Sequence, residues 1–226
     1  MSPIAPQDVT GLVLAGGLGT RMGGADKGLQ VFDGLPLALH ALRRLRLQVG
    51  GVALNANRNR AVYESFGAPV WSDDLPDHPG PLAGFLAGLD RCGTPFLLAV
   101  PCDTPLFPSD LAERLARSLV AHDAELAVAA ASQADRHGVV SLRPQPACCL
   151  LRTGLRESLR RFVAGGGRKI DAWTAGHRRV VVPFDRPGDD PDAFRNANTF
   201  DELDALRGRG ASVAEGPACA SDPLRP

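Results

Sequence analysis

The sequence lacks the features that would assign it to several specialised classes of protein. Its 25 basic and 25 acidic residues leave no formal net charge, so bulk electrostatic attraction to nucleic acid or to an anionic membrane has no support. No apolar run approaches the ~20 residues of a membrane-spanning helix. Residues 1–8 also lack the basic and apolar segments of a secretory signal. We therefore expect a soluble cytoplasmic protein that binds neither nucleic acid nor membrane.

Cysteine usage gives no support for a disulfide framework or a zinc site. The five cysteines form no C-x-x-C pair, and their number is odd. This pattern fits the reducing cytoplasm, where structural disulfides are rare. The chain has 226 residues, of which 44% are hydrophobic and 22% charged. That length and composition suit one α/β domain with a well-buried core.

A glycine-rich loop near the N-terminus is the most informative feature. The apolar run 9–15 predicts a buried strand, and residues 16–24 then contain five glycines. Arg21 lies among these glycines and Lys27 follows them. Glycine lets successive backbone N–H groups converge on an anion, and nearby cations reinforce such a nest. We interpret the loop as a phosphate cradle at the end of the first strand. The alternative is a glycine-rich turn with two solvated cations.

The spacing of this loop differs from two familiar phosphate-binding motifs. A Walker A loop ends in Gly-Lys-Ser/Thr, whereas Lys27 here follows Asp26. A dinucleotide fingerprint requires G-x-G-x-x-G, and the run from Gly17 to Gly23 has one residue too many. The loop is therefore a phosphate cradle of another kind.

Apolar runs alternate with amphipathic segments along the remainder of the chain. This alternation predicts a single-domain α/β fold, with a Rossmann-like, mostly parallel sheet and helices on both faces. We expect the domain at 9–206, a disordered lead at 1–8 and a disordered tail at 207–226. Strands are predicted at 9–15, 52–54, 68–71, 96–100, 125–131, 139–142, 147–151 and 179–182. Helices are predicted near 36–49, 59–66, 81–90, 108–120 and 153–164, with a last one within 193–206.

Three polar residues follow successive predicted strands. Asn55, Asp73 and Asp103 lie within three residues of the ends of such runs, so a parallel sheet would bring them to the same edge as the glycine loop. A phosphate cradle beside a carboxylate is what Mg²⁺-dependent phosphoryl or nucleotidyl transfer requires. Each residue taken alone could instead be a strand-end turn residue.

These motifs resemble those of a known enzyme family. Leu14-Ala15-Gly16-Gly17-x-x-x-Arg21-Met22-Gly23-x-x-Asp26-Lys27 is similar to the loop of nucleotidyltransferases of the sugar-nucleotide pyrophosphorylase type. A more specific resemblance is to molybdenum cofactor guanylyltransferases. It is carried by the segments Asn55-Ala56-Asn57-Arg58, Pro79-Gly80-Pro81-Leu82-Ala83-Gly84 and Pro101-Cys102-Asp103-Thr104-Pro105, with Asp73 between the first two. The segment Asn196-x-Asn198-Thr199-x-x-Glu202-Leu203 resembles the end of those enzymes.

The resemblance implies an activity and a set of roles. GMP would pass from GTP to the phosphate of molybdopterin, with release of pyrophosphate and with Mg²⁺ as cofactor. Arg21, Lys27 and Asp103 would be catalytic, and Asp103 would bind the metal. The residues implied in nucleotide binding are Leu14, Ala15, Gly16, Gly17, Lys27, Asn55, Asp73, Gly80, Pro81, Leu82 and Asp103.

The resemblance also implies where the pterin lies and which partners receive the product. The pterin side is expected near 135–138 and around Arg168 and Lys169. We expect a monomer that passes its product to molybdoenzymes or their chaperones. Two other functions stay open: a cytidylyl- or sugar-1-phosphate nucleotidyltransferase, and a non-catalytic GTP-binding partner protein.

Overall fold

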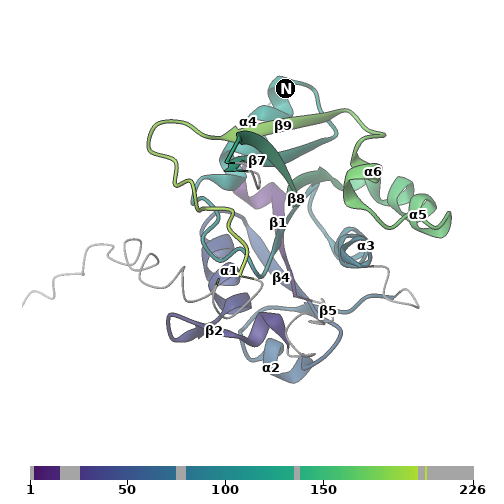
Figure 1. Cartoon of the computed structure of the whole chain (residues 1–226). Coiled ribbons are helices and arrows are strands. Elements are labelled where there is room, and N and C mark those ends of the chain that lie inside the picture. Colours follow the sequence, from purple (N-terminus) through teal and green to yellow (C-terminus); the bar gives the residue numbers. More distant parts are fainter. Residues whose placement is uncertain (1–2, 16–25, 75–79, 135–137, 198–201, 203–226) are drawn as a thin grey trace, which may run out of the picture.

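A mixed, mostly parallel sheet forms the centre of the computed structural model, which describes residues 3–15, 26–74, 80–134, 138–197 and 202 (Figure 1). The strands are β1 (Val9–Leu14), β4 (Gly51–Asn55), β5 (Val70–Trp71), β6 (Phe96–Pro101), β7 (Leu126–Ala134), β8 (Val140–Arg152) and β9 (Arg179–Phe184), and β2 (Val31–Phe32) pairs separately with β3 (Leu35–Pro36). The α-helices are α1 (Leu37–Arg46), α2 (Arg60–Glu64), α3 (Pro81–Arg91), α4 (Leu111–Ala121), α5 (Arg156–Ala164) and α6 (Ile170–Thr174). Short 3-10 helices are η1 (Pro6–Asp8), η3 (Lys27–Leu29) and η4 (Thr153–Leu155).

The strand order places the ends of four parallel strands at one edge. The order is β5-β4-β1-β6-β8-β7-β9, so β6 is the middle strand, as its continuous apolar run predicts. β1 pairs in parallel with both β4 and β6, and Leu14 lies opposite Asn55 on one side and Pro101 on the other. β8 alone among these strands runs antiparallel to its neighbours β6 and β7. The predicted α/β class and mostly parallel sheet are therefore confirmed.

Helices cover both faces of the sheet, and each face has its own hydrophobic core. On one face, α1 and α4 pack against the β1 residue Val13 and its neighbours. On the other face, α3, α5 and α6 pack against Leu12 and Leu14 of the same strand (Figure 1). This alternation of side chains along β1 is what a strand buried on both faces requires. No described helix has the length and apolarity needed to cross a membrane.

The prediction of a disordered lead is wrong for residues 3–8. η1 lies within this segment, and the Ala5 N–H donates to the Asp8 carboxylate at 3.2 Å. The Gly50 N–H donates to the Pro6 carbonyl at 2.6 Å, and Ile4 packs against the core. A β-carbon at Gly50 would lie 2.6 Å from the Gln7 backbone, so this glycine allows the close approach. Short-range capping and one close contact thus order a segment without apolar periodicity.

The C-terminal half differs from the prediction at two elements. The two short strands predicted at 139–142 and 147–151 form one long strand, β8, whose register with β7 shifts at a bulge near Val128. The strand continues through Pro144 and Pro146 because this part of β8 lies beyond its pairing with β6 and needs fewer backbone donors. The short helix α6 was not predicted. The last helix expected within 193–206 and the tail at 207–226 fall largely outside the described residues.

Candidate active site

The site lies where β1, β4, β5 and β6 end. Backbone hydrogen bonds continue the sheet one residue beyond these strands, since the Ala15 N–H donates to Asn55 O at 2.8 Å. The Cys102 N–H likewise donates to Leu14 O at 3.0 Å. The start of the glycine loop, the Asn55 segment and the Asp103 segment are therefore held side by side. Gly16, Gly17 and Arg21, also predicted for this site, lie outside the described residues.

Lys27 and Asp103 meet at this edge, as the parallel sheet predicts. The Lys27 Nζ lies 2.6 Å from the Asp103 Oδ2, and each side chain is 19% exposed. A lysine from the segment after the glycine loop and a carboxylate from the end of β6 thus form a partly shielded ion pair. Both groups remain within reach of a bound molecule.

A C-terminal segment holds the Asp103 loop from the other side. The Ala197 N–H donates to the Asp103 carbonyl at 2.8 Å. The hydroxyl of buried Thr104 donates to the Asn196 Oδ1 at 2.9 Å. These bonds hold the backbone around Asp103, and the Thr104 hydroxyl also lies 3.5 Å from the Asp103 Oδ1. Asn196 belongs to the sequence motif, but only the structure assigns it this contact.

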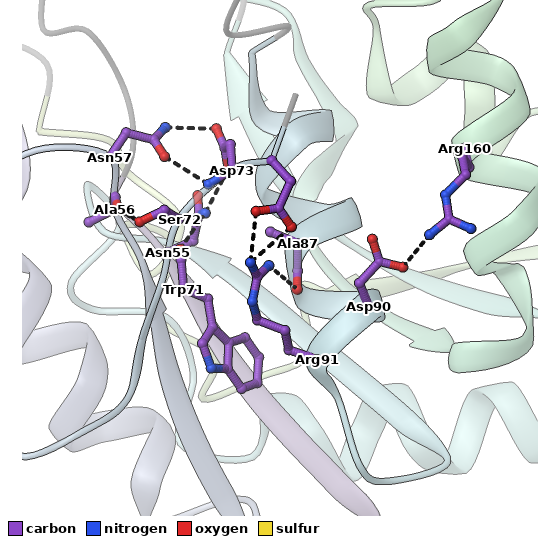
Figure 2. Close-up of polar contacts among 11 residues, drawn as sticks. Asn55, Ala56, Asn57, Trp71, Ser72, Asp73, Ala87, Asp90, Arg91 and Arg160 are labelled. Atoms are coloured by element: carbon purple, nitrogen blue, oxygen red, sulfur yellow. Dashed lines mark hydrogen bonds and ion pairs between the residues drawn. The ribbon is translucent and has the colours of Figure 1, made fainter. Parts of the chain in front are cut away.

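Two asparagines, Asn55 and Asn57, hold the Asp73 carboxylate (Figure 2). The buried Asn55 amide donates to the Asp73 Oδ1 at 2.8 Å and to the Trp71 carbonyl at 2.9 Å. Asn57 donates to the Asp73 Oδ2 at 2.7 Å and accepts from the Asp73 N–H at 2.8 Å. Each carboxylate oxygen of Asp73 is thereby fixed while keeping a second acceptor position. Asn57 was missed as a site residue, although its repetition two residues after Asn55 was a signal.

The start of α3 supplies the last predicted binding segment. Gly80 precedes the helix with a φ of 75°, which favours glycine, and Pro81 occupies the first turn. Both are exposed. The Leu82 side chain is fully buried in the core of that face. Only the backbone of Leu82 is therefore suited to the nucleotide contact expected of it.

Gly84 is the point at which α3 contacts Asn55. A β-carbon at Gly84 would lie 2.4 Å from the Asn55 Oδ1 and 2.9 Å from the Leu14 side chain. We expect Gly84→Ala to displace Asn55 and to weaken GTP binding about tenfold, because a packed core resists an added methyl group. Calorimetric titration with GTP measures this effect. Gly93→Ala is the control, since a β-carbon there meets no atom within 4 Å. Unchanged affinity in Gly84→Ala would contradict the placement of Asn55 in the nucleotide site.

Arg168 and Lys169 of the predicted pterin side are described, and no described contact joins either of them to this cluster. Residues 135–137 lie outside the described part of the chain. Arg168 donates to the Val163 carbonyl at 3.1 Å and to the Gly167 carbonyl at 2.8 Å. Val163 belongs to α5, so Arg168 satisfies backbone carbonyls near the end of that helix. Lys169 is exposed immediately before α6.

Two features near this site, the Cys102 thiol and a cavity beside α3, supply no reactive group to it. Burial raises the pKa of the Cys102 thiol well above its usual range, so the thiol next to Asp103 stays protonated. A cavity of about 320 Å³ lies between α3 and α5, lined by Asp74, Ala83, Leu86, Ala87, Asp90 and Arg160. Its carboxylates are already paired, since Asp74 pairs with Arg91 and Asp90 pairs with Arg160 (Figure 2).

Comparison with known proteins supports the family resemblance that the sequence motifs indicate. The family model described as the MobA-like NTP transferase domain matches residues 11–180. The molybdenum cofactor guanylyltransferase of Acidovorax sp. (strain JS42) is 65% identical over 208 residues, covering 92% of this chain and 99% of that protein. The enzyme of the same name from Albidiferax ferrireducens is 60% identical over 210 residues, covering 92% of this chain and 100% of the relative.

Solved structures give the same fold at lower identity. Molybdopterin-guanine dinucleotide biosynthesis protein A from Archaeoglobus fulgidus superposes with a TM-score of 0.69 at 22% identity, covering 88% of this chain and 96% of that one. A 4-diphosphocytidyl-2C-methyl-D-erythritol synthase from Anaerococcus prevotii gives a TM-score of 0.65 at 10% identity, with 89% and 97% covered. Both solved structures thus share the fold of this chain. By its family model and its closely similar relatives, the chain belongs to the MobA-like nucleotidyltransferases and, within them, to the molybdenum cofactor guanylyltransferases.

Proposed function

We propose that this protein transfers GMP from GTP to the terminal phosphate of molybdopterin in the molybdenum cofactor. An acceptor phosphate oxygen attacks the α-phosphorus of GTP, the bond to the β-phosphate oxygen breaks, and pyrophosphate leaves. The observation that carries the proposal is the Lys27–Asp103 pair, 2.6 Å apart at the ends of the parallel strands. Such a reaction depends on positioning and on charge neutralisation more than on a protein base.

The described residues divide between the two ends of the nucleotide. Lys27 neutralises phosphate charge, as would Arg21 of the glycine loop. Asn55 and Asp73 bind the nucleoside, and their mutual hydrogen bonds hold both groups in place beforehand. The backbone of Leu14, Ala15, Gly16 and Gly17, together with the Gly80–Leu82 segment, completes the nucleotide site. This division follows the motif resemblance and is supported by the convergence of the described members.

The donor set at Asp103 suits Mg²⁺. No cluster of three or more His, Cys, Asp or Glu side chains that could hold a metal occurs among the residues that the structure describes. Mg²⁺ is typically bound by one or two carboxylates together with substrate phosphates and water. Asp103, partly exposed at the strand end, would hold the ion. When bound, Mg²⁺ supplies charge stabilisation on the phosphate oxygens.

Assembly, location and downstream partners are proposals based on the family resemblance. We infer a cytoplasmic monomer that passes the guanine dinucleotide form of the cofactor to molybdoenzymes or their chaperones. Size-exclusion chromatography with light scattering checks the monomer, and a stable dimer would contradict it.

A nucleotide panel tests the proposed function. Purified protein is incubated with Mg²⁺, molybdopterin and each of the four ribonucleoside triphosphates, and pyrophosphate release is measured. We expect release with GTP at least about 100-fold above release with CTP, because a site built to hydrogen-bond one base leaves polar groups unpaired with another. Turnover with CTP instead would identify a cytidylyltransferase. GTP binding without pyrophosphate release would identify a non-catalytic GTP-binding protein.

A further inference from the structure

Asp26, the residue before Lys27, receives hydrogen bonds that the proposed reaction does not use. Its Oδ1 accepts from the Tyr63 hydroxyl at 2.6 Å and from the Gly28 N–H at 3.2 Å. Its Oδ2 accepts from the Asn59 amide at 2.8 Å and lies 3.5 Å from the Arg58 Nε. A carboxylate offers about four acceptor positions. With only 8% of the residue exposed, Asp26 is held from four directions.

These contacts fix the backbone on both sides of Lys27. Asp26 caps η3, whose first residue is Lys27, and the Leu29 N–H donates to the Asp26 carbonyl at 3.1 Å. A β-carbon at Gly28 would lie 2.4 Å from the Tyr63 hydroxyl oxygen. Glycine is therefore required where the chain passes over this tyrosine. The Lys27 side chain starts from a fixed point and ends beside Asp103.

The segment 55–59 joins the two halves of the site. Asn55 and Asn57 hold the Asp73 carboxylate on the nucleoside side. Two residues further along, Asn59 holds the Asp26 carboxylate. Asn59 has a left-handed φ of 49°, a conformation that asparagine tolerates better than most residues. The same short loop thus contacts the carboxylate beside the lysine and the carboxylate proposed to bind the nucleoside.

Tyr63 lets the network be tested without disturbing the core. Its ring is fully buried and contacts Phe66 edge-on, with 5.7 Å between ring centroids. Burial, together with the hydrogen bond to Asp26, raises the pKa of Tyr63 well above its usual range, so the hydroxyl remains a donor. Phenylalanine at this position keeps the ring and removes only the hydroxyl.

We propose that Asp26 and Tyr63 are positioning residues that act through Lys27, holding its ammonium group where the GTP phosphates bind. This inference rests on the proposed role of Lys27 in phosphate binding. The described partners of the Asp26 carboxylate are Gly28, Asn59, Tyr63 and Arg58, and Asp103 is not among them, so we expect the effect of Asp26 to be on the geometry of the lysine. A merely structural Asp26 would stabilise the fold and leave the affinity of the folded protein for phosphate unchanged.

A double-mutant cycle separates these roles. Wild type, Lys27→Ala, Tyr63→Phe and the double variant are compared by kcat/KM for GTP, by affinity for GTP and guanosine, and by melting temperature. We expect Tyr63→Phe to lower kcat/KM for GTP about 10- to 100-fold and to leave guanosine affinity within about twofold of wild type. In the Lys27→Ala background it should lower kcat/KM no further, because coupled residues are not additive. Equal losses for guanosine and GTP, or multiplicative effects in the double variant, would overturn the inference.

A control variant and the kcat/KM of Lys27→Ala make the outcome specific. Thr10→Val removes a 2.8 Å hydrogen bond to Thr94 at the opposite end of β1 and should leave kcat/KM unchanged. If Lys27→Ala lowers kcat/KM but Tyr63→Phe multiplies that loss, the positioning role fails and the proposed function stands. If Lys27→Ala leaves kcat/KM unchanged, the proposed role of Lys27 fails and the positioning role fails with it.

Discussion

Asp103→Asn should abolish guanylyl transfer while leaving the protein folded. The substitution keeps the shape of the side chain but removes the negative charge that pairs with Lys27 and would hold Mg²⁺. Uncompensated phosphate charge in the transition state should lower kcat by about 10³-fold. The fold should persist because the structural bond of Asp103, from Ala197, goes to its backbone carbonyl. Pyrophosphate release at saturating GTP and molybdopterin, with circular dichroism for folding, measures both effects.

Asp90→Asn is a matched control for this variant. Asp90 on α3 also pairs with a cation, the Arg160 Nη2 at 2.7 Å, and its side chain is 25% exposed against 19% for Asp103 (Figure 2). It lines the cavity between α3 and α5 rather than the strand ends, so we expect turnover within about twofold of wild type. Near-normal turnover in Asp103→Asn would show that Asp103 is only a turn residue. An equal loss in both variants would point to a general effect of removing a charge.

Lys27→Ala should weaken GTP binding about 30- to 100-fold. The Lys27 ammonium lies beside Asp103 at the edge where we propose that the phosphates bind. Charge-assisted hydrogen bonds to phosphate are among the strong ones. The variant also leaves the Asp103 carboxylate without its partner. Binding of guanosine, which has no phosphate, should change little. Calorimetric titrations with guanosine and GTP separate the affinity for the nucleoside from the affinity for the phosphates.

Lys169→Ala serves as the control, since the chain contains only these two lysines. Lys169 is exposed before α6, and no described contact joins it to Lys27 or Asp103. Its replacement should leave GTP affinity unchanged. Unchanged GTP affinity in Lys27→Ala would instead count against the phosphate cradle inferred from the glycine-rich loop.

The alternation of strands and helices was enough to predict where the main polar residues of the site lie. Once the strands are parallel, Asn55, Asp73 and Asp103 must reach one edge, and the structure confirms that Asn55 meets Asp73 and Lys27 meets Asp103. Only the strand ends are needed for this prediction, because a polar residue just after a parallel strand lies at the carboxyl edge of the sheet.

The sequence could not predict how these residues are supported. The bond from Tyr63 to Asp26 joins residues 37 positions apart, and a tyrosine in a short helix gives no sign of such a partner. The ordering of residues 3–8 depends on one close contact with Gly50, which no periodicity reveals. Long-range side-chain hydrogen bonds depend on the packing of whole elements, so they become visible only in the folded chain.

The bond between Thr104 and Asn196 has a consequence for the order in which the protein forms. These residues are 92 positions apart, and closing so long a loop carries an entropic cost that nearer contacts avoid. During synthesis from the N-terminus, the Lys27–Asp103 pair can form while much of the chain is still absent. The Asp103 segment gains its second support only after residues 196 and 197 have left the ribosome. In the nascent protein, the Thr104–Asn196 support is therefore added after the Lys27–Asp103 pair can form.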